Sequence, residues 1–400
     1  MASIQKKNEE GTKWLLIVSD GSSGDKRIRR TKIFHGTEKQ AIKASILFEE
    51  EVKQGRYKAG SKEMKFAEFA EMWFEDYGDK QLAPKTIARY KEMLNTRIMP
   101  AIGHLKLDKL KPMVINRLIN DIADSPRQDN RPGKLSAQTI KHHYRCISAI
   151  LQDAVEWDVI VENPCARVKP PKVPRTRVKV FNENETGAFL TALEGAPLKH
   201  RALVWLEFAT GLREGEIMGL EWGDIDFNDK TVRVERVSQY LPERGVFEKD
   251  PKTQESRRTL AIPQNVVELL KQYKAEWNEK KLKKGDLWKK TERLFTTWDG
   301  MPGHTYWPQQ WLTGFLRKNN LPHCSFHSLR HLNVTMQIKA GIPLKQVSIR
   351  AGHTDIGTTG NIYAEALESV DREAAEKLGE MLENRDAKGK EKGKKDKEQM

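Results

Sequence analysis

Two histidines and an arginine stand together in the hexapeptide FHSLRH, at the start of a segment with helical apolar spacing. His327 and Arg330 are three residues apart, so they lie on one face of a helix. Leu329, Leu332 and Met336 have the spacing of the opposite side, which we expect to face a core. The first turn of such a helix is suited to bind an anion, above all a phosphate group.

A second arginine occupies a comparable position earlier in the chain. In the sequence TGLREGE, Arg213 follows Gly211, where we expect one helix to end before another begins. Arginines at two separate places suit a phosphodiester, because its two non-bridging oxygens must both be held and neutralised. Glu216 follows Arg213 by three residues, a spacing at which the two side chains can pair. An ion pair without any catalytic role is the alternative reading of Arg213 and Glu216.

Three further reactive residues complete a fixed order along the chain. PKTQES contains Lys252, and AGHTDIGTTGNIY contains His353 and Tyr363. The order of arginine, lysine, HxxR, GH and tyrosine resembles the tyrosine recombinases, in particular the phage and mobile-element integrases of bacteria. Each motif alone is common, whereas the complete set is specific. The resemblance covers nearly the whole chain and includes the segment LSAQTIKHHYRCISAILQDAVEWDVIVENP.

The resemblance implies a reaction in which DNA strands are broken and rejoined. Tyr363 is the implied nucleophile, which forms a 3′-phosphotyrosyl link and releases a 5′-hydroxyl. Arg213 and Arg330 are implied to clamp the scissile phosphate, and Glu216 is implied to buttress the site at the acidic position usual in the family. Lys252 is the implied general acid for the leaving oxygen, with a pKa lowered by nearby arginines. Because the covalent link conserves the bond energy, no ATP, metal or other cofactor is expected.

The histidines are implied to have different roles. His327 and His353 are expected to hydrogen-bond the phosphate and to assist proton transfer, whereas His331 is expected to be structural. A zinc site is the alternative, and the lack of cysteine pairs and of an HExxH helix argues against it. Two departures from the family pattern, Leu332 and Ala351, fall at non-catalytic positions.

Other residues compete for two of these roles. Tyr306 is a second candidate nucleophile, but it lacks the motif context of Tyr363. The basic neighbours that compete with Lys252 are Lys249, Arg257 and Arg258. Lys252 is preferred because the resemblance places a PKT sequence before a strand at this point.

These residues require a multidomain α+β chain to position them. We expect a small three-stranded β-sheet plus helix, then a helical domain, then a mainly α-helical catalytic domain with a small β-sheet. In the first, Trp14, Leu16 and Val18 alternate as in a half-buried strand. In the catalytic domain, KTVRVERVSQY and SRRTLAIP are each predicted as one strand. The predicted ranges are 1–58 for an arm-type DNA-binding domain, 64–165 for a helical core-binding domain, 166–178 for a proline-rich linker, 179–383 for the catalytic domain and 384–400 for a disordered basic tail.

Composition favours a polyanionic partner. The 400 residues include 70 Lys and Arg against 56 Asp and Glu, which gives a net charge of +14. The candidate DNA contacts are Arg27, Arg29, Arg30, Lys85, Arg89, Lys141, His142 and Arg145. An ordinary charged surface is the alternative for each of them.

Several other classes of protein are disfavoured by the sequence. No apolar run of about 18 residues is present, so no membrane contact is expected. The N-terminus lacks the apolar region of a signal peptide, and the three cysteines are too few and scattered for a disulfide framework. We therefore expect the chain to act in the cytoplasm of a bacterial host cell.

The resemblance also implies the partners. They are double-stranded DNA attachment sites of core and arm type, three further copies in a homo-tetramer, and an excisionase or DNA-bending host factor. The other hypotheses are a non-catalytic DNA-binding protein, a type IB topoisomerase and a chromosome-dimer-resolving recombinase. The complete set of reactive residues argues against the first, and the additional N-terminal domain argues against the other two.

Overall fold

The computed structural model describes residues 3–7, 11–23, 26–53, 64–127, 131–174, 180–249, 257–352 and 375–376. The chain divides into two compact units, Met1–Arg175 and Thr176–Met400, and each is described by itself. Within the described ranges, no helix has both the length and the apolar character needed to cross a membrane.

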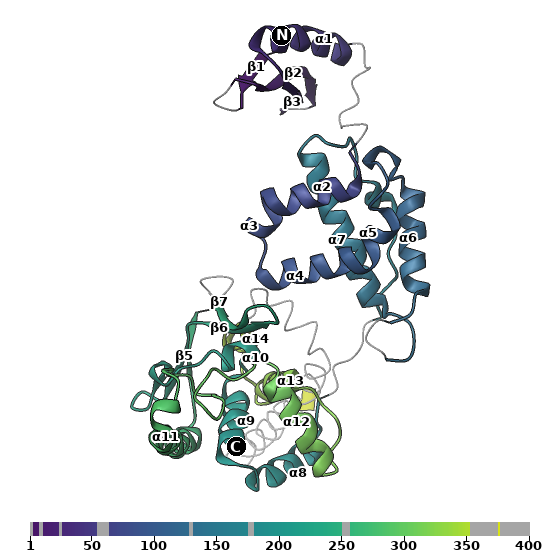
Figure 1. Ribbon diagram of the computed structural model, residues 1–400. Coiled ribbons are helices and arrows are strands. Elements are labelled where there is room, and N and C mark those ends of the chain that lie inside the picture. The colour runs from purple at the N-terminus through teal and green to yellow at the C-terminus, as the bar shows by residue number, and fades with distance from the viewer. Residues whose placement is uncertain are drawn as a thin grey trace, which may run out of the picture. The chain divides into compact units, whose positions relative to one another are not determined.

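The chain begins with a three-stranded antiparallel sheet of order β1-β2-β3, as predicted (Figure 1). Its strands are β1 (Ser3–Lys6), β2 (Lys13–Ser23) and β3 (Lys26–His35), and helix α1 (Glu38–Lys53) packs on the sheet. The alternation in β2 is confirmed, because Trp14, Leu16 and Val18 are all buried. They form a small core with Phe48 of α1.

The second part of the first unit is helical. Its elements are α2 (Phe66–Trp73), η1 (Phe74–Gly78), α3 (Asp79–Gln81), α4 (Pro84–Met93), η2 (Leu94–Ile98), α5 (Met99–Ile102), η3 (Leu107–Lys109), α6 (Pro112–Asp124), α7 (Ala137–Glu156) and η4 (Pro164–Arg167). Two of them, η1 and η2, are single π-helical turns that join α-helical segments. The predicted apolar stripe of Phe66, Phe69 and Trp73 is buried. Val168 still packs in this core, so the packing continues past the last helical turn.

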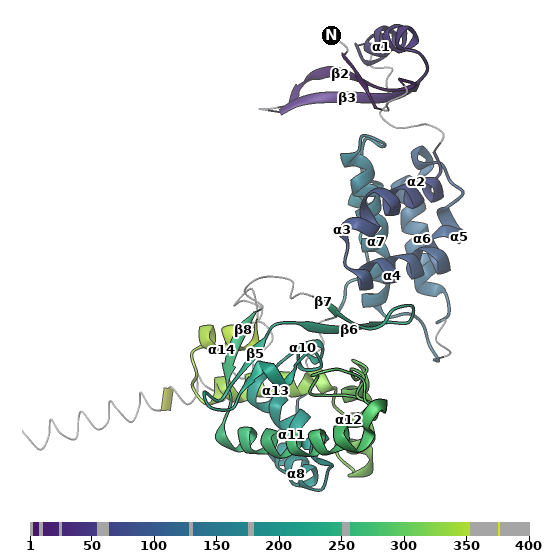
Figure 2. The same cartoon turned by 60° about the vertical axis from the view of Figure 1, so that its left-hand side comes forward.

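The second unit carries most of the reactive residues. Its elements are α8 (Glu183–Glu194), α9 (Leu198–Thr210), α10 (Glu214–Ile217), η5 (Trp222–Asp224), β4 (Ile225–Asp226), β5 (Thr231–Val234), β6 (Val237–Leu241), β7 (Gly245–Lys249), β8 (Arg258–Ala261), α11 (Gln264–Lys284), η7 (Gly285–Leu287), α12 (Trp307–Lys318), α13 (Phe326–Lys339) and α14 (Leu344–Ala351). A three-stranded antiparallel sheet has the order β4-β5-β8, and β6 pairs with β7 in a separate ribbon (Figure 2).

The prediction of one strand over KTVRVERVSQY was wrong. The segment forms two strands in two different sheets, β5 and β6, and the partner strand β7 was not predicted. The reason lies at Arg236, between the two strands. Its guanidinium pairs with Asp224 at 2.5 Å and with Glu221 at 3.3 Å, so it anchors the chain where it leaves the first sheet.

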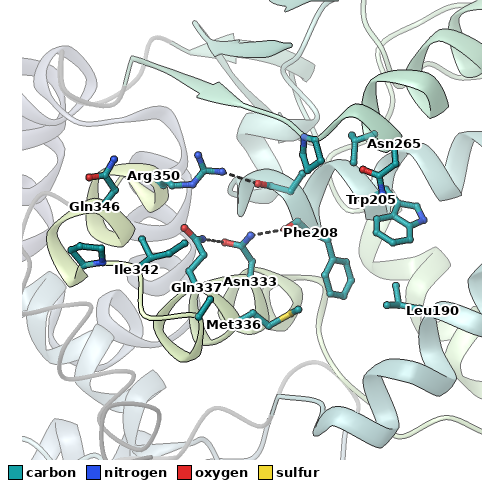
Figure 3. A pocket seen from close by; sticks show the side chains of 15 residues that line it. Leu190, Trp205, Phe208, Asn265, Asn333, Met336, Gln337, Ile342, Gln346 and Arg350 are labelled. Carbon is teal, nitrogen blue, oxygen red and sulfur yellow. Dashed lines mark hydrogen bonds between the residues drawn. The ribbon is translucent and has the colours of Figure 1, made fainter. Parts of the chain in front are cut away.

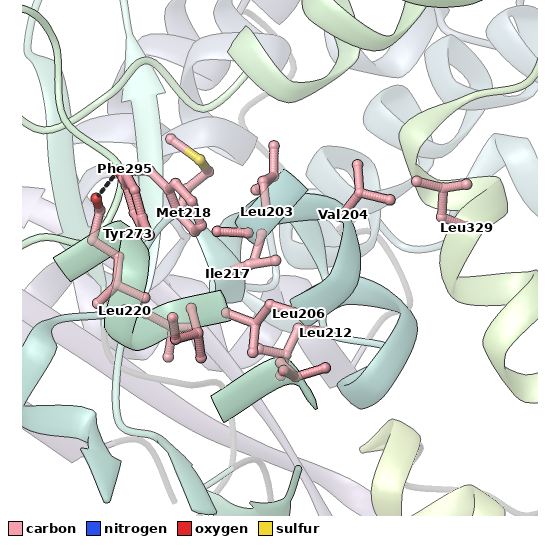
Figure 4. Close-up of a cluster of buried hydrophobic side chains, with 14 of the residues drawn as sticks. Leu203, Val204, Leu206, Leu212, Ile217, Met218, Leu220, Tyr273, Phe295 and Leu329 are labelled. Carbon is pink, nitrogen blue, oxygen red and sulfur yellow. Dashed lines mark hydrogen bonds between the residues drawn. The ribbon is translucent and has the colours of Figure 1, made fainter. Parts of the chain in front are cut away.

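Helix α9 runs through the core of this unit and packs against α11 and α13. Leu203, Val204 and Leu206 are fully buried on it, among residues from the turn that follows and from α13 (Figure 4). A helix buried around most of its surface is held firmly in place. The reactive residues at its C-terminal end are therefore attached to a rigid element.

Candidate active site

Arg330 is buried at the centre of the site, with 2% of its surface exposed. It lies in the first half of α13, whose N-terminus is capped by Ser325, the acceptor of the Ser328 amide at 3.1 Å. The guanidinium donates to the carbonyls of Gly211 and Ala351, each at 2.5 Å. These carbonyls belong to the C-terminal ends of α9 and α14, which carry partial negative charge. Arg330 therefore connects three helices by two charge-assisted hydrogen bonds.

Arg213 approaches the same place from another direction. It is the residue before α10, and its guanidinium donates to the carbonyl of Gly352 at 2.8 Å. Gly352 directly follows the residue that accepts from Arg330. The side chain of Arg213 is 43% exposed, in contrast to that of Arg330. The two arginines thus converge on consecutive carbonyls at the end of α14, and Arg213 retains access to solvent.

Glu216 holds two arginines at once. One carboxylate oxygen accepts from the Arg213 guanidinium at 2.8 Å, and the other accepts from the Arg213 amide at 3.0 Å and from Arg258 at 2.8 Å. Burial acts to raise the pKa of Glu216, but the adjacent Arg258 and Arg213 lower it below its ordinary value. The carboxylate is therefore ionised, and it fixes the direction of the Arg213 side chain.

Arg258 was considered in the sequence only as a competitor of Lys252, and its place in the site was missed. Its side chain is 6% exposed, and its Nε donates to the carbonyl of Arg350 at 3.0 Å. It begins β8, two residues before the buried Leu260, so both point to the inner side of the sheet. This alternation is the signal that would have distinguished Arg258 from Arg257.

The two histidines of FHSLRH lie side by side. The rings of His327 and His331 meet edge to face with centres 4.7 Å apart, and only His331 is buried. Loss of solvent and the positive charges of Arg330 and Arg213 lower the pKa of His327. His327 is therefore neutral at pH 7, so it can both donate and accept a proton.

Two more buried polar side chains, Glu207 and Asn333, surround the site and were missed in the sequence. The carboxyl of Glu207 is fully buried on α9 and has no hydrogen-bond partner among the described residues. Burial raises its pKa well above the ordinary value, so the group is uncharged. Asn333 donates to the carbonyl of Phe208 at 2.5 Å and connects α13 to α9. An apolar-looking helix such as α9 gives no sequence signal for a neutral glutamic acid.

A cavity of ≈640 Å³ lies beside these helices (Figure 3). Asn333 and Gln337 line it and are hydrogen-bonded to each other at 2.6 Å. Arg350 also lines it and donates to the carbonyl of Ala209 at 3.0 Å. Met336, which was predicted to face the core, lines this cavity instead and is 47% exposed. The reason is that α9 and α13 do not close over Met336, since Trp205, Phe208 and Ala209 of α9 line the same cavity.

The remaining site predictions are located as follows. Lys252, His353 and Tyr363 lie outside the described residues. Arg213, Glu216, His327, Arg330 and His331 come together in one place. Within the described residues, no cluster of three or more His, Cys, Asp or Glu side chains is arranged to hold a metal ion.

The predicted DNA contacts fall into two groups in the first unit, one on strand β3 and one on helices α4 and α7. Arg27, Arg29 and Arg30 are in β3, opposite Ser22, Ser19 and Val18 of β2. In the helical part, Arg89 of α4 lies close to His142 and Arg145 of α7. Partial burial lowers the pKa of His142, and the positive charges of Arg89 and Arg145 lower it further. Lys85 is exposed and Lys141 is half-buried on the same two helices.

Comparison with known proteins finds related families and chains. Residues 179–369 match the Phage integrase family, and residues 65–123 match the Phage integrase, N-terminal SAM-like domain. A XerC-like tyrosine recombinase of Caldanaerobacter subterraneus subsp. tengcongensis is 27% identical over 92% of this chain and 96% of its own. The Tn916 transposase of Enterococcus faecalis is 28% identical over 57% of this chain and 58% of its own.

Solved structures share the fold. The Tn1549 transposon integrase, in complex with a circular intermediate DNA, superposes with a TM-score of 0.64 at 20% identity, over 79% of this chain and 99% of that one. A lambda integrase tetramer bound to a Holliday junction gives a TM-score of 0.53 at 17% identity, over 88% of this chain and 93% of that one.

Proposed function

We propose that Arg213, Arg330 and His327 bind the DNA phosphate that Tyr363 attacks. The proposal starts from the fact that this chain belongs to the phage integrase family of tyrosine recombinases. The chain is a site-specific DNA recombinase of the tyrosine type, which breaks and rejoins DNA strands. The convergence of Arg213 and Arg330 on the end of α14 is the observation that carries the residue assignment. His353 follows that end directly in the sequence.

Each of these residues has a separate role in the reaction, which follows from its charge and protonation state. The phenolic oxygen of Tyr363 forms a bond to phosphorus, and the bond from phosphorus to the 5′-oxygen breaks. The leaving oxygen takes a proton from Lys252, and His327 with His353 assists in removing the phenolic proton. The fixed charges of the arginines stabilise the phosphorane as negative charge builds on its oxygens. Rejoining is the same sequence in reverse, with a 5′-hydroxyl as nucleophile.

The assembly is part of the proposal. Four copies act on two duplexes through a Holliday junction, with arm-type sites bound by residues 1–58 and core-type sites by the helical and catalytic parts. This is supported by the likeness to a lambda integrase tetramer bound to a Holliday junction. An excisionase or a DNA-bending host factor sets the direction, and the setting is the cytoplasm of a bacterial host.

A covalent trap tests the catalytic assignment. DNA that flanks the gene is nicked at successive positions to make suicide substrates, which are then incubated with the wild-type chain, Tyr363→Phe or Tyr306→Phe. We expect an SDS-resistant protein–DNA adduct with the wild type and with Tyr306→Phe, and none with Tyr363→Phe. An adduct that persists in Tyr363→Phe and disappears in Tyr306→Phe would overturn the assignment of the nucleophile.

The trap also tests the alternatives. Tight and specific binding without an adduct on any nicked substrate would favour a non-catalytic DNA-binding protein. Relaxation of supercoiled DNA without a defined site would favour a topoisomerase.

A further inference from the structure

A second cavity, of ≈390 Å³, lies at the other end of α9 from the active site. It is lined by the C-terminal half of α11, the first turn of α9 and the segment 288–298. Lys199, on the first turn, and Thr210, on the last, are separated by about 16 Å along the helix axis. The volume of this cavity is within the range of small-molecule sites, about 300–1,000 Å³.

The half-buried side chain of Lys199 places an ammonium group in this cavity. The ammonium of Lys199 donates to the carbonyl of Thr296 at 2.5 Å and lies 4.2 Å from the centre of the Trp307 ring. Among the described residues, no ion pair to a carboxylate is formed by Lys199. Burial, followed by the charge of Lys280, lowers the pKa of Lys199 to about 8. A partly buried charge of this kind is stabilised by an anion placed beside it.

Two indole N–H groups add further donors to the hydroxyls of Tyr273, Thr296 and Thr297 that also line the cavity. Trp277 and Trp288 line it with 3% and 9% of their surfaces exposed, and neither indole N–H has an acceptor among the described residues. Lys280, Lys283 and Lys284 also line the cavity. Lys280 is paired with Glu276 and Lys283 with Glu279, two carboxylates that do not line it, whereas the ammonium of Lys284 lies over the Trp298 ring. Among the described lining residues, donors outnumber acceptors and none is acidic, which favours a ligand rich in acceptors.

An exposed aromatic ring lies at the edge of this cluster. Trp298 lines the cavity and is 70% exposed, with the ammonium of Lys284 4.8 Å from its ring centre. Exposed tryptophan rings provide a stacking surface for planar ligands, and base–aromatic stacking is worth about 1–3 kcal/mol per base. The cluster therefore combines an anion site with a stacking surface.

We propose that this cavity binds a nucleotide, with its phosphates at Lys199 and Lys284 and its base against Trp298. Phosphate is matched because lysines bind it as point charges and it has only acceptor oxygens to offer at neutral pH. The volume suits one nucleotide and not a duplex. The site is separate from the phosphate site of recombination, because the two lie at opposite ends of α9.

Isothermal titration calorimetry of the full chain tests this site with ADP, inorganic pyrophosphate and adenosine at constant ionic strength. We expect one ADP per chain, with pyrophosphate bound at least tenfold more weakly and adenosine more weakly still. Lys199→Met and Lys284→Met should each weaken ADP at least tenfold, and Trp298→Ala should weaken ADP but not pyrophosphate. Lys290→Met is the matched control, because this exposed lysine does not line the cavity.

The possible sources of the phosphate are distinguished by competition. Duplex DNA should not displace ADP from the cavity, whereas displacement would mean that the nucleotide occupies the DNA-binding surface. The proposal would be overturned if neither ADP nor pyrophosphate bound. It would also be overturned if the affinity for ADP fell equally in Lys199→Met, Lys284→Met and Lys290→Met. Lys284→Met keeps the test decisive if Lys199→Met fails to fold, which thermal unfolding checks.

Discussion

At the scale of single residues, the two arginines of the site are held in different ways. Arg330 is buried, and each half of its guanidinium bonds a separate backbone carbonyl. Arg213 is partly exposed and is held by Glu216 and by one carbonyl. Arg330 thus combines a structural task with its proposed catalytic one, whereas Arg213 depends on its acidic partner for its direction.

Replacing Arg330 with lysine should therefore reduce both activity and stability. A single ammonium cannot bridge the carbonyls of Gly211 and Ala351, and an unpaired buried carbonyl costs about 1–3 kcal/mol. We expect covalent adduct formation to fall by about 10²-fold or more. Suicide-substrate assays and urea unfolding measure the two effects. Arg213→Lys is the control, with a similar loss of adduct but a smaller loss of stability, and equal destabilisation by both would contradict this account.

Glu216→Gln should give a stability loss that depends on pH. Because the pKa of Glu216 is lowered on folding, its contribution is fully present above the unfolded value of about 4.3 and is lost as pH falls through the folded pKa. Urea unfolding should show the wild type more stable than the variant at pH 7, with the two curves converging in acid. A difference that remains constant below pH 4 would show that packing, and not charge, explains the effect.

At the scale of elements, the turn after α9 fixes the active site. Gly211 has φ of +62°, and its carbonyl accepts from Arg330. A Cβ atom at this position would lie 2.5 Å from Oδ1 of Asn333, so any other residue would have to displace the Asn333 side chain, which bonds Phe208 and Gln337. The left-handed residue therefore leaves room for the Asn333 side chain that joins α13 to α9, and its carbonyl positions the arginine.

Gly211→Ala should thus lower both stability and cleavage. Alanine is strained at positive φ, and the contact with Asn333 adds to that strain. Gly187→Ala is the matched control, because Gly187 lies inside α8 and an added Cβ would meet nothing within 4 Å. That variant should gain about 0.5–1 kcal/mol. Thermal unfolding and adduct yield report the outcome, and a neutral Gly211→Ala would refute the argument.

At the scale of the whole molecule, the net charge of +14 predicts DNA binding that depends strongly on salt. Each phosphate contact contributes about 0.9 to the slope of log K against log salt. The double variant Arg89→Gln with Arg145→Gln should therefore reduce the slope by about two. Fluorescence anisotropy across a salt series measures it, with Lys289→Gln plus Lys290→Gln as the control of equal charge. Equal slopes for the two double variants would show that Arg89 and Arg145 of the helical part do not contact DNA phosphates.

The alternation in β2 and the apolar stripe of α2 could both be predicted from the sequence, and the burial of these residues confirms them. Each is a property of spacing within a short segment, where the period of a helix or strand determines which side chains share a face. The same local patterns predicted the position of Gly211 between two helices, and the left-handed backbone there agrees.

Only the tertiary structure decided which groups meet across long separations. Segments far apart in the chain are joined by three features: the pairing of Glu216 with Arg258, the bonds from Arg330 to two helix ends, and the cavity around Lys199. The separation of β5 from β6 likewise depends on the ion pairs of Arg236. Such contacts depend on burial and packing of the complete core, which no local period encodes.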